Sequence, residues 1–419
     1  MLEKRDIINF LFVASFSMYG LGAYVSAAAS PSVGYLIGIF IHLLIIVFYA
    51  IDLIFKDGFT IRINWVYFLM VLLQLMCVVS LFVSLHHHMP GTNKIGVVTK
   101  SIMLVLPFHA YVCVLLYNEK HRDSFERLVF ISLTLLLAIN LIGFYGLGLR
   151  NETHSIEGRV TFPFLDSFYS GACMLAILNL MLLTYIKRSL GNPWRVTYLI
   201  VYFAVNLVLL YLINSRLTLL IFLGVFVLFL FNLARNVRGL FLLSVFMLPI
   251  LLNVGMLIYK ILSLPVFVVL MQRVNLIDVT TFNGRAYLWQ RAIDWLLYDQ
   301  RGLFFGNGTN GHYFLHLVPD IAAKWGVREE NTHLHSTVLM TVVDQGLVGY
   351  GLLILVCFQM FRYFRREFSK NTSDGIFYSV VVFMIFVMQV DTFVYAGPLG
   401  YLILALLVSR VAVNVDHST

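Results

Sequence analysis

Charged residues are scarce in this sequence. Asp, Glu, Lys and Arg make up 12% of its 419 residues, whereas 60% are hydrophobic. A typical soluble domain carries about 25% charged residues. A chain with so few cannot hide its apolar side chains in one soluble globule, so the composition excludes a soluble enzyme and indicates a polytopic membrane protein.

Cysteines and metal-ligand patterns are equally sparse. The four cysteines all fall inside apolar runs, without the spacing of metal ligands: Cys77, Cys113, Cys173 and Cys357. We interpret them as small hydrophobic residues, so no disulfide framework is predicted. The triplet His86-His87-His88 stands in an expected outer loop, where such runs more often stay solvated than bind a metal.

Carboxylates inside the apolar runs are few, namely Asp52, Asp166, Asp344 and Asp391. A proton-coupled transporter would place paired carboxylates and broken helices near the midplane in corresponding halves of the chain. That pattern is not evident. Asp344 lies about two and a half helical turns beyond His335, so we expect it to bond a neighbouring helix rather than a substrate.

Long apolar runs dominate the rest of the chain. At roughly twenty residues per crossing, we predict spans near 7–27, 32–54, 64–85, 101–117, 128–148, 162–186, 196–213, 217–233, 240–258, 337–360, 377–391 and 397–413. The prediction is an all-α polytopic integral membrane protein with about 12 transmembrane helices, in a single transmembrane domain over 1–419. The run Ala27-Ala28-Ala29 resembles a signal-peptide cleavage site, but the following spans need the first run as a partner, so we expect it to be retained.

The basic residues set the orientation. Lys and Arg number 29 against 21 for Asp and Glu, and they lie between apolar spans rather than on one face. Topology therefore explains them better than a nucleic acid does, and no nucleic-acid partner is expected. Placing the more basic segments inside puts both termini in the cytoplasm. One long loop, about 259–336, then lies outside, between spans 9 and 10.

The long loop has an organisation of its own. From Asn283 onward, apolar residues recur at helical spacing, which predicts an interfacial amphipathic helix with Asn283 as N-cap and with Trp289 and Trp295 as anchors. Four glycines between 302 and 311 then mark a turn-rich stretch whose bare backbone can approach a ligand. The stretch lacks the lysine and the strand–helix frame of a nucleotide-binding loop.

Three arginines are expected at the outer surface. Arg216 stands in a polar break between two apolar runs too close together for a true loop, Arg285 begins the amphipathic helix, and Arg159 directly precedes a span. Guanidinium groups bind phosphate oxygens in bidentate fashion, so several aimed at one spot form a diphosphate clamp. The alternative is that each arginine reaches to lipid headgroups. Arg216, inside the break, fits that alternative least.

Two histidines stand where the polar loop turns into an apolar helix. His333 and His335 open the stretch Asn331 to Leu347. A neutral imidazole can remove the proton of an acceptor hydroxyl. The alternative is an interfacial histidine bonded to a backbone carbonyl. As a metal pair they are weak, because residues two apart on a helix diverge and no third ligand stands nearby.

These motifs resemble the O-antigen ligase and polymerase family. The resemblance rests on a Ser-Arg in an outer helix break, on Asn-Gly-Arg-Ala-Tyr-Leu-Trp, on Phe-Gly-Asn-Gly, on His-Leu-His-Ser and on Asp-Gln-Gly-Leu-Val-Gly, in that order over about 210–350. Family members transfer a glycan from an undecaprenyl diphosphate carrier to an acceptor hydroxyl on the periplasmic face, without metal or nucleotide.

The resemblance implies a membrane glycosyltransferase of surface polysaccharide and lipopolysaccharide biosynthesis in the bacterial inner membrane. It implies a diphosphate bound by Arg216 and Arg285, with Arg159 similar to a third family position. His335 would be the base and His333 its support, although Ser336 stands where the family often has Asn, which leaves the assignment between the two histidines open. No cofactor or metal is expected. The expected partners are the undecaprenyl-diphosphate-linked glycan donor, a glycan or lipid A-core acceptor, the lipid bilayer and, for polymerisation, a chain-length regulator protein.

Two functional questions stay open at this point. Asn-Gly-Arg and Gln-Gly-Leu-Val-Gly resemble the polymerase branch slightly more, whereas His-Leu-His is common in ligases. The sequence therefore favours a polymerase over ligation to lipid A-core. The competing class is a non-enzymatic flippase for lipid-linked oligosaccharides, in which the arginines would bind the diphosphate in transit.

Overall fold

Helices form nearly all of the structure, as the long apolar runs predict. The computed structural model describes residues 4–54, 63–87, 94–118, 125–150, 160–235, 239–245, 285–325, 328–329, 332–393 and 398–413. Over these residues the chain is helical between turns and loops, and no β-strand occurs among them. The predicted fold class, an all-α polytopic membrane protein, is confirmed.

The helices follow the order of the predicted spans. The first part of the chain contains α1 (Lys4–Ala28), α2 (Pro31–Ile54), α3 (Trp65–His86), α4 (Lys94–Tyr117), α5 (Phe125–Leu141) with its π-turn η2 (Ile142–Gly146), α6 (Phe168–Arg188), α7 (Pro193–Ile213), α8 (Arg216–Leu230), η4 (Leu233–Arg235) and α9 (Leu240–Val245). The second part contains α13 (Arg285–Asp294), η5 (Trp295–Asp299), α14 (Gly311–Phe314), α15 (Pro319–Trp325), α16 (Thr337–Ser369), η7 (Ser373–Ile376), α17 (Phe377–Val390) and α18 (Pro398–Ala412).

The number of crossings can be compared with the prediction only in part. Among the described residues, nine helices are long and apolar enough to cross a membrane, and two shorter apolar helices lie at Arg216–Leu230 and Leu399–Ala412. These correspond to predicted spans 1 to 8 and 10 to 12. The ninth predicted span, 240–258, is described only over α9. The total of about twelve therefore stays a prediction.

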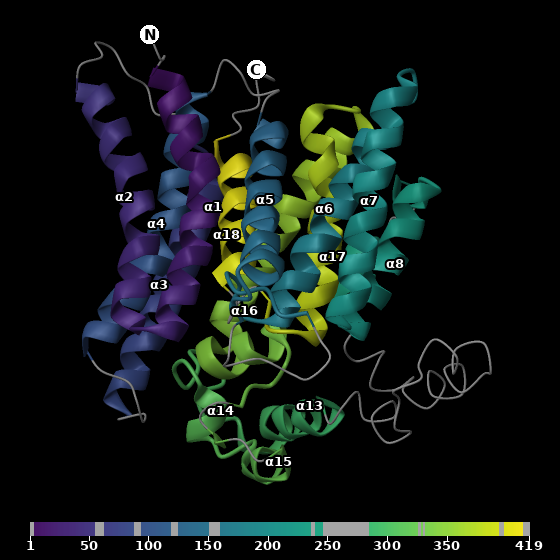
Figure 1. Cartoon of the computed structure of the whole chain (residues 1–419). Helices are drawn as coiled ribbons and strands as arrows, with labels where there is room; N and C mark the ends of the chain where they lie inside the picture. The colour runs from purple at the N-terminus through teal and green to yellow at the C-terminus, as the bar shows by residue number, and fades with distance from the viewer. Residues whose placement is uncertain are drawn as a thin grey trace, which may run out of the picture.

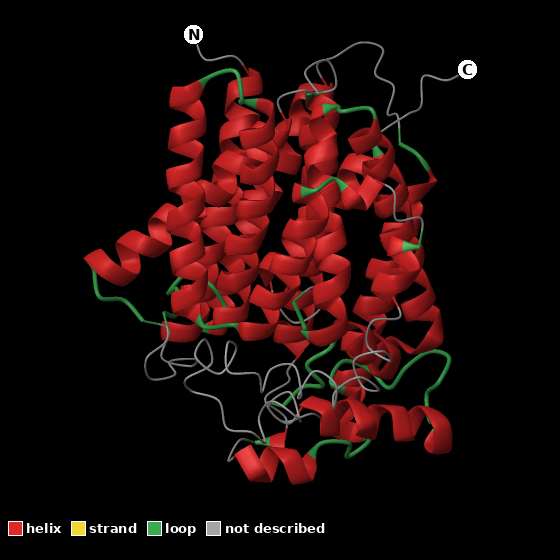
Figure 2. Cartoon of the chain, turned by 90° about the vertical axis from the view of Figure 1, so that its right-hand side faces the viewer, coloured by secondary structure: helices red, strands yellow, loops and turns green. Residues whose placement is uncertain are grey.

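The elements between α9 and α16 are set apart from the helix bundle. Figure 1 shows α13, α14 and α15 gathered beyond one end of it, which we call the outer end, while α1 begins and α18 ends at the opposite, inner end. The view in Figure 2, turned by 90°, shows the same separation. Within the long loop predicted over about 259–336, residues 259–284 lie outside the described part of the chain, and so does Asn283, the expected N-cap.

Two helices are buried at the centre of the bundle. In the most apolar stretch of η7 and α17, 94% of the residues are buried, and in the most apolar stretch of α6, 78% are buried. The corresponding share is 28% in α3 and in α7. A helix that is apolar all round is stable only where other helices or lipid surround it. The centre is therefore made by α6 and α17, and α3 and α7 present broad apolar faces to the lipid.

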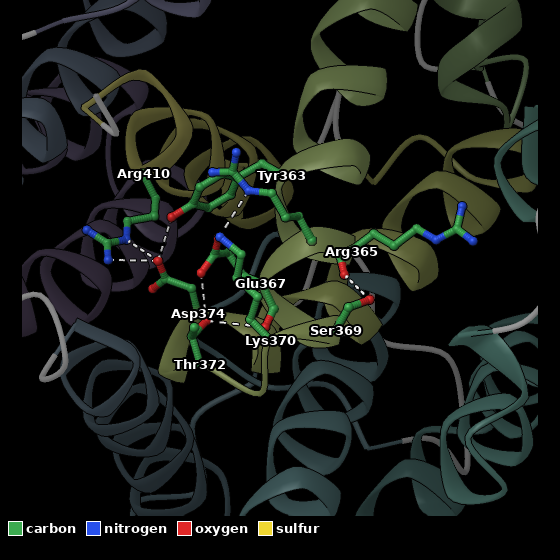
Figure 3. Close-up of polar contacts among 9 residues, drawn as sticks. Tyr363, Arg365, Glu367, Ser369, Lys370, Thr372, Asp374 and Arg410 are labelled. Atoms are coloured by element: carbon green, nitrogen blue, oxygen red, sulfur yellow. Dashed lines mark hydrogen bonds and ion pairs between the residues drawn. The ribbon is translucent and has the colours of Figure 1, made fainter. Parts of the chain in front are cut away.

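The inner end is closed by a buried polar cluster, shown in Figure 3. Asp374 in η7 accepts hydrogen bonds from Tyr363 Oη at 2.6 Å and from Arg410 Nε at 2.8 Å. Arg410 Nη2 lies 2.7 Å from the same carboxylate oxygen, and both charged side chains are 5% exposed. The cluster joins the inner ends of α16, α17 and α18.

Candidate active site

The histidine segment, residues 332–336, is held by two side chains from separate elements. His312 of α14 bonds Thr332 O through Nε2, and Trp289 of α13 donates from Nε1 to Leu334 O at 3.0 Å. Burial, and then the neighbouring His333, lower the pKa of His312 to about 4, so its ring is neutral near pH 7. The segment is thereby fixed to the outer elements along most of its length.

The burial of the two tryptophans differs from the sequence prediction. Trp289 and Trp295 were expected to anchor α13 in the membrane interface, but they are 0% and 3% exposed. Trp289 can be buried because Leu334 O supplies the acceptor that a buried indole N–H needs. Trp289 thus holds the histidine segment rather than lipid. The apolar residues exposed in this region are Tyr287, Leu297 and Tyr298.

The backbone of His335 has a left-handed conformation, with φ at +48°. This conformation costs a non-glycine residue about 1–3 kcal/mol and persists only where the surroundings impose it. Next to His335, Ser336 caps α16 by accepting a bond from Leu339 N at 3.2 Å. Thr337 donates to Asp391 O from its backbone N at 2.9 Å and from Oγ1 at 2.8 Å. The contacts on both sides impose the turn that presents the His335 ring.

The two histidine rings lie close together but contact different surroundings. Their centroids are 4.9 Å apart. The His335 ring is 6.3 Å from the ring of Tyr169, at the start of α6. His333 instead lines a cavity between the helices. Among the described residues, no group of three or more His, Cys, Asp or Glu side chains could hold a metal ion.

Arg285 is buried beside Tyr169 and the outer end of α17. Its Cζ lies 5.1 Å from the centroid of the Tyr169 ring. Its Nη1 donates to Val390 O at 2.7 Å, and Nη2 is 3.7 Å from Asp391 Oδ2. Burial works against the charge, but Tyr169 and Asp391 outweigh it and raise the pKa of Arg285 above its usual value. A permanent positive charge therefore stands beside His335.

The surroundings keep His335 neutral. Burial first, then the charge of Arg285 and then His333, hold the pKa of His335 well below its usual value. Each cause disfavours the imidazolium, because a charged ring loses its hydration and is repelled by the guanidinium. A neutral imidazole next to a fixed positive charge can accept a proton from a substrate that brings negative charge with it.

Arg216 lies at the tip of a tight helical hairpin, as its polar break predicts. Asn214 ends α7 with φ at +58°, and α8 begins at Arg216, whose side chain is exposed. The hairpin lies near the other site residues, since a side chain on Gly171, two residues from Tyr169, would meet Ile213 at 3.3 Å. In addition, α8 packs against α17, whose outer end holds Arg285. Arg159 lies outside the described residues.

A cavity of about 510 Å³ adjoins the site. Apolar residues of α1, α3, α4, α16 and α18 form most of its wall, for example Met70, Leu73 and Leu404. His333, Asp166 and Asn310 line it as well. Burial raises the pKa of Asp166 to about 6. The volume suits part of a small ligand or lipid chain, for which pockets of roughly 300–1,000 Å³ are usual.

The glycine-rich stretch and the Asp-Gln-Gly sequence form one structural unit. Helix α16 is broken at Gly346, with φ at +69°. Leu347 N donates to Leu303 O at 2.8 Å, and Asn307 N donates to Val343 O at 3.0 Å, so the loop 302–311 lies against the break. The bare backbone of this stretch approaches α16. Only glycine tolerates this φ and this closeness, because a Cβ on Gly346 would overlap the backbone of Phe304.

Asp344 bonds a neighbouring helix, the short α14, where loop 302–311 ends, in line with the sequence prediction. Its carboxylate accepts from Gly311 N at 2.8 Å and from Asn310 N at 3.2 Å. The backbone amides at the start of a helix attract a negative charge. The short helix α14, which carries His312, is therefore positioned by an acid on α16.

Sequence reasoning missed several residues of the site. Tyr169 gives no sequence signal, and Asp391 was recognised only as an acid at the outer end of a span. Both are more than 90 residues from Arg285 in the chain and meet it only through the packing of α6 and α17. His312 and Trp289 offered a signal of their own, since each is a polar ring in an apolar helical pattern.

Comparison with known proteins supports the same region. The family model described as O-antigen ligase matches residues 199–354. The matched part runs from α7 to the first half of α16, and it contains Arg216, Arg285, His333 and His335 but neither Arg159 nor Tyr169. No curated protein matches the chain. This part of the chain, which contains both histidines, is thus similar to the O-antigen ligase family.

Proposed function

We propose that the protein transfers a glycan from an undecaprenyl diphosphate carrier to an acceptor hydroxyl, with His335 as the base. The observation that carries the proposal is the neutral His335 ring near Tyr169, whose ring also contacts the buried guanidinium of Arg285. Arg285, Arg216 and Arg159 would bind the diphosphate. His333, 4.9 Å from His335, would support the base from the cavity side.

The reaction needs only a neutral histidine as base and guanidinium groups that stabilise negative charge. The acceptor hydroxyl gives its proton to the neutral His335 ring while its oxygen attacks the anomeric carbon of the donor sugar. The bond from that carbon to the diphosphate oxygen breaks, and undecaprenyl diphosphate leaves as an anion. Guanidinium groups can stabilise that charge without protonating the leaving oxygen. Paired carboxylates of the glycosidase type are then unnecessary.

Binding of the donor also strengthens the base. In the free protein the positive charge of Arg285 is one cause of the low pKa of His335. A diphosphate beside Arg285 would neutralise that charge and add negative charge near the ring, which favours the imidazolium. His335 would thus become a better proton acceptor only when the donor is in place, which limits unproductive protonation of the empty site.

The apolar cavity gives the carrier lipid a place to enter. It lies between helices that cross the membrane, and His333 lines it together with Asp166. The first isoprene units of the carrier fit this apolar space, with the diphosphate at the side of the histidines. The basic residues Arg362, Arg365 and Arg366 lie near the inner end, which supports a bacterial inner-membrane protein with cytoplasmic termini and a periplasmic site.

Polymerisation remains the favoured branch, on the motifs that resemble polymerases. A chain-length regulator would then be a partner. A flippase would need the arginines, but it would gain nothing from a neutral histidine held in a costly backbone conformation. That difference makes the enzymatic proposal testable against transport.

The test is reconstitution of the full chain in phosphatidylethanolamine and phosphatidylglycerol vesicles with lipid-linked repeat units. Longer lipid-linked glycans would identify a polymerase, and product formed only after addition of lipid A-core would identify a ligase. Both products should disappear with His335→Ala. Movement of the lipid-linked units across the bilayer without any new glycosidic bond, unaffected by His335→Ala, would overturn the proposal in favour of a flippase.

A further inference from the structure

The loop 302–311 is bound to two membrane-crossing helices through its backbone. On the α16 side, Leu347 N and Val348 N donate to Leu303 O at 2.8 Å and to Phe304 O at 3.1 Å. On the α3 side, Thr309 N donates to Ser80 O at 3.0 Å. The depth of the loop in the membrane is therefore fixed by Val348 on one helix and by Ser80 on the other.

Helix α16 places the loop inside the apolar layer. Arg362, with an exposed side chain, is the first charged residue of α16 after Asp344 and marks its inner boundary. Val348 stands fourteen residues before it, which is about 21 Å along a helix rising 1.5 Å per residue. The hydrocarbon core is about 30 Å thick, so it reaches roughly 9 Å past Val348. Any tilt of α16 lets the helix cover less depth and places Val348 deeper still.

Helix α3 gives the same depth independently. It begins at Trp65, which is 53% exposed, and tryptophan side chains concentrate at the membrane–water boundary. Ser80 lies fifteen residues further along, or about 22 Å. A hydrocarbon core of about 30 Å again extends several ångströms beyond the point where the loop is bound. The helices α16 and α3, which contact opposite ends of the loop, thus give the same depth for it in the membrane.

Many polar groups of the loop have the hydrogen-bond partners that such a position requires. In hydrocarbon, non-helical backbone is tolerated only where its N–H and C=O groups find partners. Gly306 N donates to Gly302 O at 2.7 Å, Gly308 N donates to Asp344 O at 3.0 Å, and Gly311 N donates to the Asp344 carboxylate at 2.8 Å. Asn307 Nδ2 donates to Arg301 O and Val343 O at 3.0 and 3.1 Å.

The side chains that the loop leaves exposed are apolar. Phe304 and Phe305 are 62% and 74% exposed, and Leu347 and Val348 of the adjoining helix are 39% and 38% exposed. Leu355 and Phe358 continue this surface down α16. Immediately before the loop, Asp299 and Arg301 form an ion pair at 2.7 Å. The last charged residue, Arg301, thus stands just before the exposed aromatic residues, which is the order expected at a headgroup boundary.

We propose that residues 302–311 form a re-entrant segment seated in the outer half of the bilayer, with Phe304 and Phe305 in contact with lipid acyl chains. The segment carries Thr309 and Asn310, which line the cavity together with His333. Its insertion would hold the outer elements at a fixed depth and keep the histidines level with the headgroups. This inference does not depend on which reaction the site performs.

The test measures the depth of position 305 in vesicles. The variant Phe305→Trp is reconstituted in phosphatidylcholine whose acyl chains carry bromine, and its tryptophan fluorescence is compared with that of the unmodified chain. The added tryptophan should emit at short wavelength, and more than half of its emission should be quenched by bromine. Iodide in the aqueous phase should leave it nearly unchanged. Phe304→Trp should give the same pattern.

The matched control is Ala323→Trp. Ala323 is exposed on α15, which lies well away from the bundle in Figure 1. Its tryptophan should be quenched by iodide and not by bromine. Equal behaviour of positions 305 and 323 would overturn the proposal. So would emission from position 305 that neither bromine nor iodide quenches, since protein rather than lipid would then cover it.

Discussion

Each end of the helix bundle holds a buried arginine beside a buried aspartate, and the two pairs differ in construction. At the inner end, Arg410 contacts Asp374 Oδ2 from two nitrogens, at 2.8 and 2.7 Å. At the outer end, Arg285 and Asp391 are 3.7 Å apart. The shortest hydrogen bond of Arg285 goes instead to a backbone carbonyl, at 2.7 Å.

The difference separates a close ion pair from a looser one, at which we propose that the donor binds. At the inner end, a second donor, Tyr363 Oη, bonds the same carboxylate, so the charge of Arg410 is closely matched. At the outer end, the guanidinium is positioned by backbone and by the Tyr169 ring, and its charge is felt at His335. Both pairs flank α17, which connects them. We expect an anion such as diphosphate to bind at the outer pair, whose ion-pair distance of 3.7 Å is longer than the 2.7 Å of the inner pair.

The largest effect is expected from removing the inner carboxylate. Asp374→Ala leaves the buried Arg410 without its partner, and breaking a buried ion pair in this way costs about 3–5 kcal/mol. Asp391→Ala should cost less, because its ion pair is longer. Thermal unfolding in detergent micelles measures both. A melting temperature lowered more by Asp391→Ala than by Asp374→Ala would contradict the comparison.

A smaller effect, confined to the outer region, is expected from Gly346→Ala. The alanine would have to adopt the φ of +69° that Gly346 has, and its Cβ would overlap the backbone of Phe304. The conformational strain alone costs about 1–3 kcal/mol, and displacement of the loop 302–311 should reduce glycan transfer as well. Gly351→Ala is the control, since nothing lies within 4 Å of a Cβ at that position. Equal stability and activity of the two variants would show that the loop does not depend on the break.

Replacing Arg285 by lysine should lower the activity of the protein, whereas replacing Arg410 by lysine should lower only its stability. Lysine keeps the charge but not the planar fork. Hydrogen bonds to charged groups contribute about 1.5–3 kcal/mol, so Arg285→Lys should slow transfer by roughly ten-fold or more. Arg410→Lys should leave the rate per folded molecule unchanged while lowering the melting temperature. If Arg410→Lys slowed transfer while Arg285→Lys kept the full rate, Arg410 rather than Arg285 would be the arginine needed for activity.

The smallest effect is expected in the dependence on pH. An ordinary histidine is half protonated near pH 6.5, but burial and the charge of Arg285 hold the pKa of His335 well below that value. His335 should stay neutral, and transfer at low donor concentration should stay level, from pH 8 down through 6.5. The rate should fall only at more acidic pH. A rate that halves at pH 6.5 would point to a base with an unshifted pKa.

The same depressed pKa predicts how stability changes with pH. In the unfolded chain His335 takes up a proton below about pH 6.5, while in the folded chain it resists protonation. The contribution of His335 to stability is therefore fully present above pH 6.5 and is lost as the pH falls below that value. Comparing the melting temperatures of His335→Gln and the unmodified chain at pH 7.5 and 5.5 measures this contribution.

The sequence predicted those features that depend on local pattern. Apolar runs of sufficient length located the helices, and the polar break at Asn214-Ser215 located the hairpin that carries Arg216. The histidine segment was recognised because polar residues stand directly before an apolar run. Each of these signals lies within a few residues of the feature that it predicts.

Features made by distant residues could not be predicted in this way. The contact of the glycine-rich loop with α16 was not predicted, because nothing local shows that Gly346, more than thirty residues later, breaks α16 to receive the loop. Trp289 was assigned to the lipid because its acceptor, Leu334 O, belongs to another segment. The Tyr169 contact with Arg285 likewise requires the packing of α6 beside the outer elements.

The central claim is that His335 acts as the base of a glycan transfer. The most direct measurement compares transfer by His335→Ala and His316→Ala in vesicles supplied with lipid-linked repeat units and acceptor, alongside binding of undecaprenyl diphosphate. His316 is a fair control, because it also has a left-handed backbone, with φ at +51°, but its side chain is 76% exposed. We predict that His335→Ala loses about 10²- to 10⁴-fold in rate while still binding the diphosphate, and that His316→Ala stays at full rate. Undiminished transfer by His335→Ala would contradict the account.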